Sequence, residues 1–242
     1  MKKNICLLFT GKIKLENTKE LVSLLTGSEN EYYITLTTWV NEYTNDFELL
    51  FPNSFINYID LPDQKNIYKF ISGHRYESTR PLSNYYHQLY IRSKAVETLK
   101  KINIDFDVII LLRTDTKIWK NISDLYDDVK KDDNTVYTAI GPNWDIYGGR
   151  SSNDLLYGEG ACPDVIFFSN MPTMCKILTN QILISTETQQ VKGVYHPETC
   201  QLNCFKLLGL KIERMYFDAF VYESKYEAPG YASLPTGYNI IK

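Results

Sequence analysis

The sequence lacks the features of membrane-spanning and disulfide-rich proteins. No stretch of its 242 residues approaches the roughly 20 consecutive apolar residues that a membrane-spanning helix needs. The five cysteines include no Cys-x-x-Cys pair, and an odd count fits a reducing compartment better than a disulfide framework. The apolar run at residues 5–9 is too short for a signal peptide and has no cleavage site after it. We therefore expect a soluble, cytoplasmic protein without a transmembrane segment.

Glycine-rich ligand-binding motifs are also missing. The turn after the first apolar segment contains the single glycine Gly11, where dinucleotide-dependent oxidoreductases and methyltransferases carry a Gly-x-Gly pattern and nucleotidyltransferases a glycine-rich loop. No P-loop, Gly-x-Ser-x-Gly or His-Glu-x-x-His motif occurs anywhere in the chain. These absences argue against the enzyme classes that depend on such motifs.

The composition is that of a folded domain with no excess of positive charge. Hydrophobic residues make up 44% and aromatic residues 14% of the chain, enough apolar surface to exclude a disordered protein. The net charge of −3 argues against a nucleic-acid partner, because Lys and Arg supply most of that affinity. The 19 tyrosines suggest wet pockets or half-buried surfaces, although codon bias in an AT-rich genome would have the same result.

Short apolar runs alternate with helical patterns, which predicts an α/β fold. The five apolar residues 108–112 predict a central strand buried on both faces, and residues 82–101 predict the clearest helix. No linker divides the chain, so we expect one domain over residues 1–242, with a long irregular loop at 141–160. Further strands are expected at 5–10, 32–38, 57–61, 136–140, 165–168 and 211–217, and helices at 18–25 (with Asn17 or Thr18 as N-cap), 123–129 on the surface, 172–183 and 197–208.

The central strand stops at Arg113-Thr114-Asp115. Ligands of open α/β sheets bind beyond the carboxyl ends of strands, where a carboxylate is well placed to hold a divalent cation. An arginine there can contact a diphosphate through its forked guanidinium. The structural alternative is a salt bridge from Arg113 to a neighbouring acid, with Asp115 acting as a cap.

Residues 106–115 resemble a segment of small GT-A-type glycosyltransferases of bacterial polysaccharide clusters and large DNA viruses. Residues 33–39 are similar to the end of the second strand in those enzymes. The order of strands and helices agrees over residues 4 to about 120. The helix before the central strand also resembles its counterpart there, through His87, Gln88, Arg92 and Ser93.

The resemblance implies a single GT-A-like domain with a Rossmann-like, mostly parallel central sheet flanked by helices. Residues 1 to about 120 would bind a UDP- or GDP-linked sugar, and residues 121–242 would bind a glycan or other hydroxyl acceptor. It also implies Mn²⁺ or Mg²⁺, weakened here because Arg113 replaces the first acid of the metal-binding Asp-x-Asp motif and can take over part of the ion's charge. The donor-binding residues it implies are Thr10, Gly11, Thr38, Trp39, Arg92, Arg113 and Asp115.

The catalytic base is expected in the later half. An inverting glycosyltransferase passes through an oxocarbenium-like state and needs a carboxylate to take the proton of the acceptor hydroxyl. Asp164 is the first candidate, because it resembles the acid before a strand in this family, and Glu159 and Asp145 are rivals. A capping or solvated carboxylate is the alternative for each.

Other residues have both a functional and a structural interpretation. His196 either completes a metal site with Asp115 or lies in an exposed loop before a helix. Cys200 and Cys204, one helical turn apart, either share a metal or are buried thiols, as is usual for free cysteine. The aromatic residues Trp144, Tyr147 and Tyr157 either stack on a sugar or pack the loop.

Two functions follow from these observations. The first is a metal-assisted glycosyltransferase that uses a nucleotide-sugar donor. The second is a catalytically silent GT-A-like domain that binds a nucleotide sugar or glycan as an interaction module, since the first metal-binding acid is absent.

Overall fold

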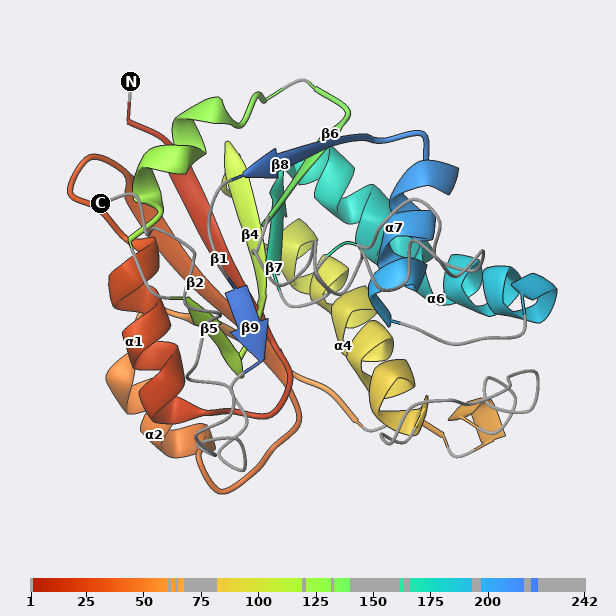
Figure 1. Cartoon of the computed structure of the whole chain (residues 1–242). Coiled ribbons are helices and arrows are strands. Elements are labelled where there is room, and N and C mark those ends of the chain that lie inside the picture. The colour runs from red at the N-terminus through yellow and green to blue at the C-terminus, as the bar shows by residue number, and fades with distance from the viewer. Residues whose placement is uncertain are drawn as a thin grey trace, which may run out of the picture.

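A seven-stranded sheet lies between two layers of helices (Figure 1). The computed structural model describes residues 2–60, 62–63, 65–67, 82–118, 121–131, 133–139, 162, 166–192, 197–215 and 219–221. The strands, in spatial order, are β3 (Phe55–Tyr58), β2 (Glu31–Thr38), β1 (Asn4–Thr10), β4 (Val108–Arg113), β7 (Ile166–Ser169), β6 (Thr135–Ala139) and β8 (Lys211–Met215). A second, two-stranded sheet pairs β5 (Thr116–Ile118) with β9 (Ala219–Val221).

The sheet is mostly parallel, as predicted. The pairs β1–β2, β1–β4, β2–β3 and β6–β8 are parallel, and only the two pairings of β7 are antiparallel. The predicted central strand is confirmed: β4 is the fourth of seven, and its residues 108–112 are all 0% exposed. A strand covered on both faces explains why that stretch is apolar without alternation.

Each face of the sheet has its own hydrophobic core. One core includes Leu7 and Ile110 and is covered by α1 (Leu15–Leu25), α2 (Thr44–Leu50) and the 3-10 helix η1 (Ser123–Asp128). The other includes Leu8 and Leu111 and is covered by α4 (Leu82–Lys101), α6 (Met171–Lys192) and α7 (Pro197–Leu207). We call these the α1 side and the α4 side. No helix in the described ranges is long and apolar enough to cross a bilayer.

Several element boundaries differ from the predictions. The helix predicted at 18–25 begins at Leu15, so neither Asn17 nor Thr18 caps it. The helix predicted at 172–183 continues to Lys192, because its second half buries Ile184 and Ser185. The strand predicted at 57–61 lies at 55–58, and α2, β5 and β9 were not predicted.

The segment predicted as a surface helix at 123–129 buries an apolar face. Ile122 and Tyr126 are 0% exposed and Val129 is 4% exposed. Their spacing of four and three residues puts them on one side of a helical turn, against the core of the α1 side. The many charged neighbours mask this spacing in the sequence.

The interpretation of Cys200 and Cys204 as buried thiols is confirmed. Both thiols are buried and neither forms a disulfide, which also holds for Cys6 and Cys162, whereas Cys175 is half-buried. Burial raises the pKa of Cys6 and Cys204 to about 12 because the thiolate is poorly solvated there.

Replacing Tyr126 by Phe should destabilise the fold. The Tyr126 hydroxyl donates a buried 2.7 Å hydrogen bond to the carbonyl oxygen of Leu25, which joins η1 to the end of α1. Its loss leaves that carbonyl without its partner and should lower the free energy of unfolding by about 1–2 kcal/mol in urea titration. Tyr43→Phe, at an exposed position, is the control. Equal stability of the two variants would contradict this role.

The cysteines should differ in their reactivity toward iodoacetamide. At about pH 8 the folded protein should be alkylated at Cys175 well before Cys6 or Cys204, since only thiolates react and the raised pKa keeps the buried thiols protonated. Peptide mass mapping over time measures the order. Denatured protein should lose the difference; comparable labelling of Cys6 and Cys175 in the folded protein would refute the assignment.

Candidate functional site

Segments far apart in the sequence meet where β1, β2 and β4 end, which we call the carboxyl edge. Thr10 is the register partner of Thr37 on one side and of Arg113 on the other. The next backbone amide, of Gly11, donates to the carbonyl oxygen of Thr37 at 3.2 Å. β1 and β4 run side by side in Figure 1 and pair in parallel, so they end at the same edge of the sheet, which is the edge expected to bind ligand.

Side-chain alternation separates the residues of this edge into two faces. Cys6 and Leu8 belong to the core of the α4 side, so Thr10, two residues farther along β1, faces that side too. The same rule places Arg113 there, since Ile109 and Leu111 precede it at even spacing. Thr38 follows Leu36 and therefore faces the α1 side.

Thr37, Thr10 and Arg113 are neighbours in register and form a row at the carboxyl edge, to which Thr37 adds an unsatisfied hydroxyl. Its side chain lies on the α4 side, like that of Thr35, which contacts Cys6 at 3.5 Å. The Thr37 hydroxyl is fully buried and has no hydrogen-bond partner in the part of the chain that the structure describes. A buried polar atom of this kind is costly unless water or a ligand satisfies it.

The turn after β1 is tied to the turn after β4. Gly11 has φ of +112°, a region that side-chain-bearing residues rarely adopt, which explains why a glycine stands there. The amide of Thr114 donates to the carbonyl oxygen of Thr10 at 3.3 Å, and the Thr114 hydroxyl donates to the carbonyl oxygen of Lys12. The two turns therefore form one unit.

Asn17 holds that unit from α1. Its side-chain amide donates to the carbonyl oxygens of Thr114 at 2.9 Å and Thr116 at 2.7 Å, one on each side of Asp115. The prediction of Asn17 as an N-cap was therefore wrong. No pattern in the sequence links it to the later turn, because the contact spans 97 residues.

Arg113 and Asp115 bind each other. The guanidinium Nε and Nη2 of Arg113 donate to Oδ1 and Oδ2 of Asp115 at 2.8 and 2.7 Å, a two-pronged ion pair. The two side chains are 19% and 24% exposed, so both are only partly open to solvent. The salt-bridge alternative for Arg113 is confirmed, with Asp115 as the acid.

The described residues do not fit a divalent cation at this edge. Both oxygens of Asp115 accept hydrogen bonds from a permanent positive charge, which opposes a second cation on the same carboxylate. Within the described ranges no three His, Cys, Asp or Glu side chains gather in a way that could hold a metal. His196, the other predicted ligand, lies outside those ranges.

Arg92 lies in the helical layer of the α4 side, away from the strand ends. It is 0% exposed, donates to the side-chain oxygen of Gln201 at 3.3 Å, and its guanidinium carbon lies 5.9 Å from the ring centre of Phe167. Phe167 pairs with Leu111, in the middle of β4. This position does not support the expected contact of Arg92 with the donor, which stays a prediction.

Trp39, at the end of β2, is half-buried, and its carbonyl oxygen accepts a bond from Asn41 at 3.0 Å. The remaining predicted residues lie outside the described residues: Trp144, Asp145, Tyr147, Tyr157, Glu159, Asp164 and His196.

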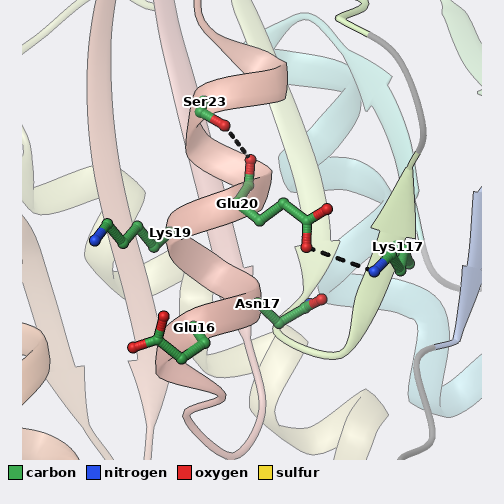
Figure 2. Close-up of a pocket in the computed structure, with 6 residues that line it drawn as sticks. All are labelled: Glu16, Asn17, Lys19, Glu20, Ser23 and Lys117. Atoms are coloured by element: carbon green, nitrogen blue, oxygen red, sulfur yellow. Dashed lines mark hydrogen bonds and ion pairs between the residues drawn. The ribbon is translucent and has the colours of Figure 1, made fainter.

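A shallow pocket of about 450 Å³ lies along α1 beside β5 (Figure 2). Glu20 on its wall pairs with Lys117 at 3.6 Å, and Asn17 points from α1 toward the turn before β5. Its other lining residues, Glu16, Lys19 and Ser23, are exposed. The pocket is on the α1 side, so it is separate from Arg113.

Comparisons with known proteins bear on the fold. No protein-family model matches the sequence, and no curated protein matches it significantly. The galactosyltransferase LgtC, solved with donor and acceptor sugar analogues, is similar in structure, with a TM-score of 0.53 and 15% identity over 86% of this chain and 72% of LgtC. An active-site mutant of LgtC has a TM-score of 0.53 and 14% identity over 87% of this chain and 72% of its own. For mouse xyloside xylosyltransferase 1 the TM-score is 0.47 and the identity 12%, over 89% of this chain and 85% of its own. The chain thus has the α/β fold of GT-A glycosyltransferases, and the predicted fold class is confirmed.

Proposed function

We propose that this chain transfers a sugar from a nucleotide-diphosphate-sugar donor to a hydroxyl group of a glycan or similar acceptor. The observation that carries the proposal is the convergence of Thr10, Gly11 and Arg113 at the carboxyl edge of a sheet with this fold. Open α/β sheets bind ligands at this edge, and a diphosphate needs positive charge there. The likeness in fold makes glycosyl transfer the best-supported chemistry.

In the proposal, the ends of β1 and β2 receive the nucleoside of a UDP- or GDP-linked sugar. Gly11 leaves room for close approach of a ligand to the backbone, and Thr38-Trp39 forms the neighbouring wall. Arg113 binds the diphosphate, because its forked guanidinium matches phosphate oxygens in geometry and charge. It stabilises the negative charge that develops on the leaving diphosphate when the sugar bond breaks.

The acceptor half, residues 121–242, supplies the base. Asp164 removes the proton of the acceptor hydroxyl as that oxygen attacks the anomeric carbon, with Glu159 as the second candidate. The resemblance predicts Mn²⁺ or Mg²⁺ at Asp115 and His196, but the ion pair of Asp115 with Arg113 argues against a metal there, and no step here depends on one. The cytoplasmic location and a role in viral or bacterial polysaccharide synthesis are likewise predictions.

A second function is supported by the Arg113–Asp115 pair. The carboxylate expected to bind a metal is already occupied by an arginine. A domain that keeps the fold but lacks the metal could bind a nucleotide sugar or glycan without turning it over. A donor-binding experiment followed by an activity assay separates the two functions.

Donor binding should raise the melting temperature of the purified protein. At a concentration about 100 times the Kd, a ligand adds about 2.7 kcal/mol of stability, which corresponds to roughly 5–10 °C for a domain of this size. We expect this shift with at least one of the UDP-, GDP- or CDP-sugars, with Mn²⁺ or with EDTA. If none shifts the melting temperature, the enzyme proposal fails. Binding without donor hydrolysis or transfer favours the silent module.

Replacing Asn17 by Ala should weaken donor binding. The change removes both hydrogen bonds that hold the turn after β4, and that turn is bound to the turn after β1 through Thr114. The backbone at Gly11 that receives the donor becomes less well positioned, so we expect a roughly tenfold higher Kd for the donor by calorimetry. Lys19→Ala, an exposed position on the same helix, is the control. Equal affinity of both variants would exclude this role of Asn17.

A further inference from the structure

Asp115 occupies the atoms of Arg113 that a diphosphate would use. A guanidinium binds a carboxylate and a phosphate with the same parallel donors. In this structure Nε and Nη2 of Arg113 both donate to Asp115, at 2.8 and 2.7 Å. A diphosphate approaching that edge of the guanidinium therefore has to displace the carboxylate.

The pair is shielded from solvent more than its neighbours. Its side chains are 19% and 24% exposed, against 47% and 60% for Lys12 and Glu42, and 30% and 49% for Lys117 and Glu20. Solvent and salt weaken exposed ion pairs most, so of these three pairs Arg113–Asp115 keeps the most of its attraction.

The carboxylate is also held in place. The carbonyl oxygens on both sides of Asp115 are bound by Asn17, and the hydroxyl of Thr114 is bound to the turn after β1. Arg113 is held at its backbone by the pairing of β4 with β1, and its long side chain can rotate about more bonds than the short side chain of Asp115. The movement needed for ligand binding is therefore a movement of the guanidinium.

We propose that Asp115 is an internal competitor of the diphosphate for Arg113, and not a metal ligand. The proposal rests on the proposed function, since it assigns Arg113 to the donor diphosphate. Asp115 is thus a positioning residue: it keeps Arg113 at the carboxyl edge without ligand and lowers the affinity for nucleoside diphosphates. This lets the donor product leave more readily after transfer.

The test is a double-mutant cycle on nucleoside diphosphate binding, measured in EDTA and repeated in buffer with Mn²⁺. Calorimetry measures the Kd of UDP, GDP and inorganic pyrophosphate for the wild type, Asp115→Asn, Arg113→Gln and the double variant. Asp115→Ser is a second variant at the same position, and circular dichroism checks that each is folded. Asp105→Asn is the matched control, because it removes one carboxylate beside Lys131 at the amino end of β4.

We expect Asp115→Asn and Asp115→Ser to tighten diphosphate binding roughly fivefold, the equivalent of one released ion pair. Arg113→Gln should weaken it about tenfold or more, through the loss of a charged donor. In the Arg113→Gln background the gain from Asp115→Asn should disappear, since Asp115 acts through Arg113. Asp105→Asn should leave the Kd unchanged.

Each other outcome overturns the competitor role. An equal gain with and without Arg113 means that Asp115 only repels the ligand. Weaker binding by Asp115→Asn, confined to buffer with Mn²⁺, means that Asp115 holds a metal. If neither the wild type nor any variant binds UDP, GDP or pyrophosphate, the inference is refuted. If pyrophosphate follows the expected pattern while no nucleotide sugar binds, the inference stands and the proposed donor function fails.

Discussion

The parallel pairing of β1 with both β2 and β4 is the constraint on which the candidate site depends. β1, β4 and the second half of β2 are buried on both faces, and a slip of one residue in register would turn their side chains to the opposite core. The two different cores therefore hold the register in place. Because the register is held, Thr10, Thr37 and Arg113 stay in one row at the carboxyl edge, although they come from three separate segments.

The charges of Arg113 and Asp115 determine which ligands this row suits. A partly buried guanidinium at a sheet edge suits a phosphate ligand, but a guanidinium without a counter-ion would be costly to bury in the free protein. Asp115, two residues farther along the chain, supplies that counter-ion and stabilises the partly buried guanidinium in the free protein. The fold is shared with enzymes that differ from this chain at about six residues in seven, so the chemistry has to be judged from this edge and not from the fold.

Much of the fold was predictable, because the residue pattern within a single element is enough to indicate a helix or a strand. The helix at Leu82–Lys101 and the central strand have strong periodicity or continuous burial, and both were predicted to within a residue at each end. The short helix at Thr44–Leu50 was missed, since it buries just two residues, Thr44 and Phe47. The second half of α6 was also missed. Its polar and β-branched residues have modest helix propensity, and packing against α4 and α7 overrides it.

The sequence by itself determined the order of the elements, the central strand and the presence of an arginine and an acid at its end. It left open whether that arginine would face a ligand or a neighbouring acid. Only the tertiary structure decided that Asp115 takes both donors, that Asn17 holds the turn, and that Arg92 is enclosed among helices. The reason is physical: periodicity reports which face of an element is buried, whereas hydrogen bonds between segments 97 residues apart exist only once the sheet has brought them together.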